Sequence, residues 1–131
     1  FFRRSDEDDL SALRERLDAV RTLLRDPERT EFRPVLVPEA MALAETERLV
    51  ARLREAAVPV GRLVVNRTLV DDDCDCERCR TRRELHERRV RETKAAFPDL
   101  PVTIVPELPG ESQGLDALGE IAALFAPAER A

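Results

Sequence analysis

The sequence has few glycines, one lysine and no tryptophan or tyrosine. It contains four glycines among 131 residues, and Lys94 is the single lysine. A P-loop needs glycines whose backbone N–H groups surround the phosphates, followed directly by a lysine. Lys94 follows none of the glycines closely, so this chain contains no P-loop. No apolar run approaches the ~18 residues of a transmembrane helix, and we expect no direct membrane span.

A basic surplus is also absent. The formal net charge is −5, which argues against a nucleic-acid partner, since binding to the phosphate backbone needs clustered positive charge. Hydrophobic residues make up 43% of the chain and charged residues 37%, a composition typical of one folded domain. Because the chain begins at Phe1 without a methionine, we expect it to be part of a longer protein.

The hydropathy pattern alternates between helices and short apolar runs. It predicts helices near residues 10–25, 38–53, 80–96 and 115–125, and strands at 32–37, 62–66 and 102–105. Alternation of this kind predicts an α/β fold with a partial parallel sheet of about three strands and flanking helices. The helix at 80–96 is so polar that we expect it to project from the body or to pack on a partner.

Two features follow predicted strands, where open α/β sheets bind ligands. Asn66 ends the strand at 62–66, and a proline-framed loop, 106–110, follows the strand at 102–105. An asparagine amide can donate to and accept from a purine edge, and a stiff apolar loop can lie against a flat ring. A structural role, with Asn66 capping a turn and the prolines fixing a loop, is the alternative.

The three cysteines form a cluster within an acidic loop. Cys76 and Cys79 have the CxxC spacing that lets two thiolates bind one metal ion, and Cys74 lies two residues earlier. The four ligands of a zinc site could come from the CxxC pairs of two chains, or from these three cysteines together with His86. Considered by itself, His86 is predicted to be an ordinary helix-surface residue. A redox dithiol is a third possibility, although the flanking aspartates are expected to raise the thiol pKa values.

Four segments in order carry a family resemblance. They are VPEAMALAETERLVARL at 37–53, VVNRTL at 64–69, CERCRTRRELH at 76–86 and VPELPGESQGLDAL at 105–118. From about Leu10 onward the chain resembles the carboxyl-terminal part of the ArsA/GET-type ATPases. This family includes the arsenite-pump ATPase and the ATPase that targets tail-anchored membrane proteins. The resemblance implies the carboxyl-terminal part of a P-loop NTPase fold, working as a nucleotide-gated homodimer.

The resemblance also implies roles for particular residues. Asn66 would contact the adenine of ATP, flanked by the loop residues Pro106, Glu107, Leu108 and Pro109. Cys76 and Cys79 would bind one zinc ion together with the same pair from a second chain. The P-loop, the catalytic residues and the magnesium ligands would lie upstream of Phe1. We therefore expect no catalytic residue in this chain and no ATP hydrolysis by it alone.

The resemblance finally suggests a division of the chain and a cellular role. Residues 1–27 would end a helical subdomain, and residues 28–131 would form the carboxyl-terminal part of the ATPase domain, with the CxxC loop and polar helix at 71–97. The expected protein is cytoplasmic and couples ATP binding and hydrolysis to tail-anchored protein targeting or arsenite transport. Its partners would be a hydrophobic client helix, or a membrane receptor or pump subunit. The alternative is a stand-alone, non-enzymatic zinc-binding or dimerisation module.

Overall fold

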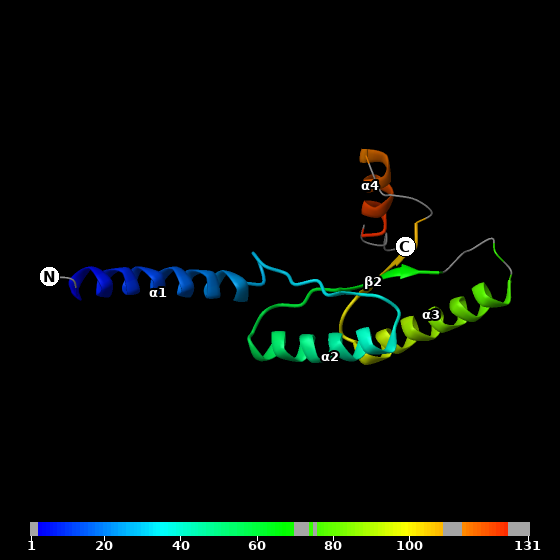
Figure 1. Ribbon diagram of the computed structural model, residues 1–131, viewed down its shortest axis with the longest axis horizontal. Helices are drawn as coiled ribbons and strands as arrows, with labels where there is room; N and C mark the ends of the chain where they lie inside the picture. Colours follow the sequence, from blue (N-terminus) through cyan, green and yellow to red (C-terminus); the bar gives the residue numbers. More distant parts are fainter. Residues whose placement is uncertain (1–2, 70–73, 75, 109–113, 126–131) are drawn as a thin grey trace.

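The chain folds around a small parallel sheet in a computed structural model (Figure 1). The structure describes residues 3–69, 74, 76–108 and 114–125, with side chains from residue 9 onward. Its elements in chain order are α1 (Arg3–Arg25), β1 (Val35–Leu36), α2 (Ala40–Glu55), β2 (Leu63–Thr68), α3 (Glu77–Ala96), β3 (Val102–Pro106) and α4 (Gly114–Ala123). The predicted α/β fold with a partial parallel sheet of three strands is confirmed.

The three strands lie in the order β1-β2-β3, and both pairings are parallel. The first strand is shorter than the predicted 32–37. Phe32 pairs with Val60 in an isolated bridge and Val35 pairs with Val64, but Pro34 between them has no N–H to donate. Pro34 instead accepts a hydrogen bond from Val64 N through its carbonyl oxygen, at 3.0 Å. The proline therefore interrupts the hydrogen-bond ladder between these two segments, but the segments stay side by side.

Helices lie on both faces of the sheet. Figure 1 shows α2 and α3 along one face and α4 on the opposite side. The core lies under α2 and α3, where Val50, Leu63 and Phe97 are buried against one another. On the other face, Arg62 Nη1 donates to Thr103 Oγ1 at 3.2 Å and to the carbonyl oxygen of Phe125 at 3.4 Å, which ties the residues after α4 to the sheet.

The polar helix α3 packs on the body of the protein, although its composition suggested that it would project or await a partner. It contacts α2 and β2, and its buried residues are His86 and Thr93. Each side chain is hydrogen-bonded: Thr93 Oγ1 donates to the Arg89 carbonyl of the same helix at 2.8 Å, and His86 Nδ1 accepts from Leu69 N, 17 residues earlier, at 3.0 Å. A helix can thus be anchored through satisfied polar groups when apolar residues are scarce.

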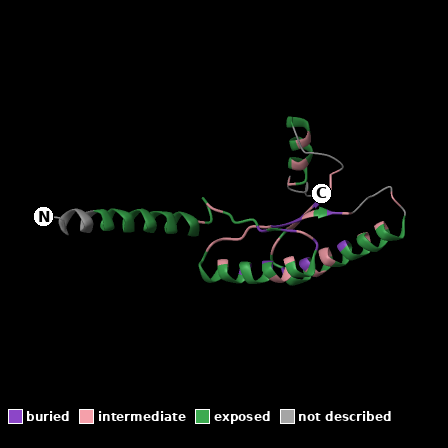
Figure 2. Ribbon diagram, viewed as in Figure 1, coloured by how far each residue is buried: buried purple, intermediate pink, exposed green. Residues whose placement is uncertain are grey.

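Helix α1 extends away from the sheet as a single arm (Figures 1 and 2). The apolar residues whose spacing predicts an amphipathic helix stay between 45% and 59% exposed: Leu10, Leu13, Leu17, Val20 and Leu24. Its end is fixed by Arg25, whose Nε donates to the Ala56 carbonyl at 2.8 Å. Among the described residues, no helix is long and apolar enough to cross a membrane.

Candidate nucleotide pocket and cysteine cluster

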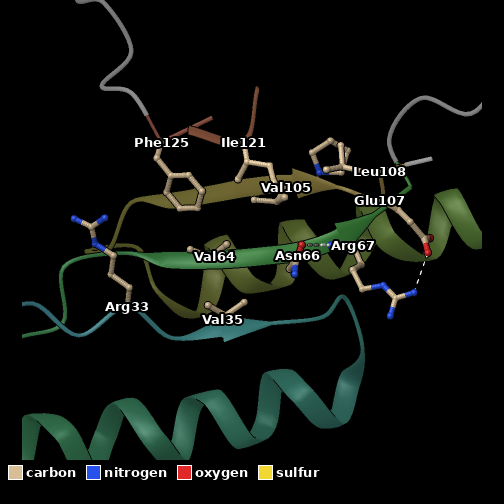
Figure 3. A pocket seen from close by; sticks show the side chains of 11 residues that line it. Arg33, Val35, Val64, Asn66, Arg67, Val105, Glu107, Leu108, Ile121 and Phe125 are labelled. Atoms are coloured by element: carbon tan, nitrogen blue, oxygen red, sulfur yellow. Dashed lines mark hydrogen bonds and ion pairs between the residues drawn. The ribbon is translucent and has the colours of Figure 1, made fainter. Parts of the chain in front are cut away.

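A pocket of about 630 Å³ lies on the face of the sheet that α4 only partly covers (Figure 3). Valines from all three strands, Val35, Val64 and Val105, form the sheet side of the pocket, and Ile121 and Phe125 line it from the α4 side. Its polar lining comes from the carboxyl-terminal ends of β2 and β3 and, at the other end of the pocket, from Arg33 before β1. Its size is within the range of small-molecule and cofactor sites.

Asn66 lies at the polar end of this pocket, near the end of β2. Its Oδ1 accepts a hydrogen bond from the next backbone N–H, that of Arg67, at 2.9 Å. This contact orients the carboxamide. Within the described part of the chain, Asn66 Nδ2 makes no hydrogen bond that would compete with a ligand. The amide therefore presents two N–H donors and one free lone pair on Oδ1.

The backbone beside Asn66 adopts an uncommon conformation. Arg67 has a φ of 60°, in the left-handed region, and the β2–β3 register is irregular between Val65 and Thr68. Non-glycine residues held in this region concentrate at functional sites. The bulge turns the Arg67 side chain to the strand end, where its Nη2 meets Glu107 Oε1 at 3.0 Å.

The loop after β3 is fixed to the end of β2. Glu107 N donates to the Thr68 carbonyl at 2.9 Å, and the Glu107 carboxylate bridges Arg67 at 3.0 Å and Arg82 of α3 at 3.5 Å. The hydrogen bond from Arg67 holds the pKa of Glu107 below its usual value, and the charges of Arg67 and Arg82 act in the same direction. Glu107 thus joins the pocket to α3, the helix that begins at the cysteine cluster.

The structure brings most of the predicted base-binding residues together. Asn66, Pro106, Glu107 and Leu108 line the same pocket, whereas Pro109 lies outside the described residues. Arg67 could not be identified from the sequence, because its contribution depends on a local bulge and a left-handed backbone. Ile121 and Phe125 were recognisable as apolar positions of the last helix, but which cavity they would face was not.

The three cysteines meet at the start of α3. Cys76 is the N-cap residue of the helix, and its Sγ accepts from Cys79 N at 3.4 Å. Cys74 Sγ lies 3.3 Å from Cys76 Sγ, and all three Sγ atoms are within 4.8 Å of one another. None of the three forms a disulfide bond. A set of soft thiol donors this close together fits zinc and related thiophilic ions.

The two CxxC thiols differ in acidity. The Cys79 N–H, followed by the thiol of Cys74, lowers the pKa of Cys76 to about 7. Hydrogen bonds with Cys74 and Cys76 raise the pKa of Cys79 to about 12. The expectation that flanking aspartates would raise the thiol pKa values is therefore wrong for Cys76, because a helix N-terminus stabilises a thiolate.

The sequence context of His86 suggested an ordinary helix-surface residue, and this prediction is wrong. His86 is only 7% exposed, and its Nδ1 holds the backbone of Leu69. It lies seven residues after Cys79, about 10 Å further along α3 at a helical rise of about 1.5 Å per residue. Within the described residues, the group of close metal-ligating side chains contains the three cysteines and not His86. A Cys₃His site within one chain is therefore not formed.

Comparison with known proteins agrees with these features. Residues 4–126 match the family described as anion-transporting ATPases. The chain is similar to the ATPase GET3C of Arabidopsis thaliana, with 38% identity over 112 residues that are 84% of this chain and 29% of that protein. It is 47% identical to the ATPase GET3B of the same organism over 77 residues, which are 59% of this chain and 19% of that protein.

A fungal relative gives the same result. The ATPase get3 of Schizosaccharomyces pombe is 29% identical over 109 residues, which are 83% of this chain and 33% of that protein. The chain thus spans about a third or less of the length of these relatives. The family match extends over nearly the whole chain, and this protein therefore belongs to the ArsA/GET family of anion-transporting ATPases.

Proposed function

We propose that this chain supplies the base-binding side of the nucleotide site in an ATPase of the ArsA/GET type. The observation that carries the proposal is the meeting of Asn66 with Pro106 and Leu108 around one pocket at the ends of two parallel strands. These elements are far apart in sequence. Their convergence supports a shared ligand over two unrelated structural roles.

The chemistry of the pocket suits adenine. The purine presents an exocyclic amine as donor and ring nitrogens as acceptors, and the Asn66 amide offers a matching acceptor and donors. Pro106 and Leu108 give apolar surface for the ring. Glu107 already binds two arginines, so we assign it the role of holding the loop in place rather than contacting the base.

The phosphates and magnesium need residues that this chain lacks. With no P-loop, it has no lysine placed to neutralise the β- and γ-phosphates. In this proposal the upstream part of the protein supplies the P-loop, the magnesium ligands and the catalytic residues. The chain alone then binds adenine nucleotides weakly and does not hydrolyse them.

A second element of the proposal is a zinc-linked homodimer. Cys76 and Cys79 lie on the first turn of α3, where they can bind a zinc ion together with the same pair from a second chain. The exposure of Cys76 supports access by a partner. Family membership supports this ATPase assignment over a stand-alone zinc or dimerisation module.

For the cellular role we favour tail-anchored protein targeting over arsenite transport. The CxxC pair and the similarity to GET3 ATPases support this choice. The apolar face of α1, exposed in this chain, would contribute to the groove that holds a hydrophobic client helix. ATP binding would close the dimer and assemble that groove, and hydrolysis would release the client, in the cytoplasm.

The base-binding role can be tested by NMR on this chain. Asn66 is the only asparagine and Gln113 the only glutamine, so the side-chain NH₂ region of a ¹⁵N spectrum contains two pairs of signals. Adding ATP should shift the Asn66 pair, whereas GTP should have a smaller effect because its base carries a carbonyl in place of the exocyclic amine.

The Gln113 signals and a variant serve as controls. Asn66→Asp keeps the size of the side chain but removes both N–H donors. In that variant the backbone N–H signals of Val105, Glu107 and Leu108 should respond less to ATP. If ATP leaves the Asn66 signals of the unmodified chain unchanged at millimolar concentration, or if GTP shifts them equally, the base-binding assignment is wrong.

A further inference from the structure

Cys74 lies outside the CxxC pair, yet the structure holds it next to that pair. Its Sγ is 3.3 Å from Cys76 Sγ, and the Sγ atoms of Cys74, Cys76 and Cys79 are all within 4.8 Å of one another. A tetrahedral ion with metal–sulfur bonds of about 2.3 Å places its sulfur ligands about 3.8 Å apart. Small side-chain adjustments therefore bring all three sulfurs to one ion.

A separate contact fixes the position of Cys74. Arg83 Nη2, on the second turn of α3, donates to the Cys74 carbonyl oxygen at 3.0 Å. This contact joins the residue before the CxxC motif to the helix that carries the motif. The third thiol is thereby positioned by the same element as the other two, without help from a second chain.

Two features at the start of α3 favour the charge of such a complex. Three thiolates around a divalent ion carry one net negative charge. The complex would lie at the N-terminus of the 20-residue helix α3, where the backbone dipole is positive, and beside the guanidinium of Arg83. Both features stabilise a negatively charged complex.

We propose that Cys74, Cys76 and Cys79 form a three-thiolate site that lets a single chain hold one thiophilic divalent ion such as zinc. The fourth position is left for water or a ligand from another molecule. This inference builds on the metal site of the proposed function and adds to it. The site of the proposed homodimer, formed by Cys76 and Cys79 of two chains and called the shared site below, needs both chains. Cys74 would let each chain bind or retain the ion when it is separated from its partner.

The test uses cobalt(II) alone with the reduced chain, separated into monomer and dimer by size-exclusion chromatography with light scattering. The monomer should bind one cobalt per chain and show the sulfur-to-cobalt charge-transfer band of a thiolate complex. In Cys74→Ser, monomer affinity should fall at least about tenfold, and the band of any remaining complex should lose about a third of its intensity. Circular dichroism of the metal-free variant checks that the fold is intact.

A pair of arginine variants tests the positioning of Cys74. Arg83→Ala removes the contact with the Cys74 carbonyl, whereas Arg80→Ala removes the same charge from the same part of α3 and leaves that contact in place. Monomer affinity for cobalt should fall more in Arg83→Ala than in Arg80→Ala. Equal effects in the two variants would contradict the positioning of Cys74 by Arg83.

The outcomes separate this inference from the shared site. A wild-type monomer that binds no cobalt, or a Cys74→Ser monomer that binds it as wild type does, overturns the three-thiolate site. A Cys74→Ser dimer that keeps one ion per two chains supports the shared site regardless of the monomer result. Dimers without metal, together with monomers that bind one ion each, would refute the shared site and support the three-thiolate site.

Discussion

His86 is predicted to stabilise the chain only while its imidazole is neutral. It is the single histidine in the sequence, it is 7% exposed, and its Nδ1 accepts the Leu69 N–H at 3.0 Å. Protonation turns that acceptor into a donor and breaks the hydrogen bond. His86→Leu removes the acceptor at any pH and fills a similar volume. It leaves the Leu69 N–H without its partner.

The expected loss of stability in His86→Leu depends on how deeply the Leu69 N–H is buried. A buried donor left without a partner costs about 1–3 kcal/mol of stability. Leu69 is only partly buried, so we expect the lower part of that range, about 1–2 kcal/mol, at pH 8. Thr93→Val is the matched control on the same face of α3. Thr93 Oγ1 donates to a carbonyl within its own helix, and the expected loss is below about 1 kcal/mol.

The pH dependence gives a sharper test. Burial lowers the pKa of His86 from 6.5, the charge of Arg82 lowers it further, and Glu107 and Glu39 act in the opposite direction. Between the lowered folded value and 6.5 the unfolded chain binds more protons, so stability is present above pH 6.5 and is lost as pH falls through the folded pKa. The difference between wild type and His86→Leu should therefore shrink from pH 8 to pH 5.

Urea unfolding followed by circular dichroism measures this difference, because the chain has no tryptophan or tyrosine for fluorescence. Groups common to both proteins cancel in the comparison. A difference between wild type and His86→Leu that stays constant from pH 8 to pH 5 would refute the link to imidazole protonation. No difference at pH 8 would refute the role of His86 in holding the Leu69 backbone.

Three further predictions concern the core, the pocket and the cysteine cluster. Leu63 of β2 is fully buried against Val50 and Phe97, and Leu63→Ala should cost about 2–5 kcal/mol of stability in urea unfolding. Met41 is 76% exposed, and Met41→Ala should change the stability by no more than about 0.5 kcal/mol. Comparable losses in the two variants would contradict the position of the core. Glu107→Gln removes the ion pairs to Arg67 and Arg82, so the ATP-induced NMR shifts of residues 105–108 should weaken with little change in stability. Its control, Glu45→Gln, removes an exposed ion pair with Arg48 on α2 and should leave those shifts unchanged. Equal effects of the two variants would contradict the positioning role of Glu107. Finally, Cys76→Ser should abolish cobalt binding by monomer and dimer alike, as measured by metal content, and a variant that keeps one ion per chain would exclude Cys76 as a ligand.

The sequence was most informative where pattern and chemistry coincide. The alternation of helices and apolar runs predicted the parallel sheet, and the strand ends predicted that Asn66 and the loop beginning at Pro106 would converge. Both inferences depend on general rules for parallel sheets, in which the carboxyl ends of the strands meet at one edge. The length of β1 was overestimated, because the effect of Pro34 on the hydrogen-bond ladder depends on which residues pair with its neighbours.

Features that depend on tertiary contacts were not predictable. The left-handed backbone of Arg67 and its ion pair with Glu107 arise from a bulge that no local residue pattern indicates. The polarity of α3 led us to expect that it would project or pack on a partner. Its packing on the body was not predictable, because it is anchored by His86 and Thr93, whose burial depends on a partner distant in sequence or on bonds within the helix. The role of Arg83 beside Cys74 depends on how the chain enters α3.

The central claim, that Asn66 and the loop after β3 surround the base of ATP, is tested most directly by photolabelling with 2-azidoadenosine triphosphate and mass spectrometry of the peptides. The label should be found within residues 64–67 or 105–108, which line the pocket, and an excess of ATP should reduce it more than an excess of GTP. Label confined to α1 or α2, or equal protection by the two nucleotides, would contradict the account.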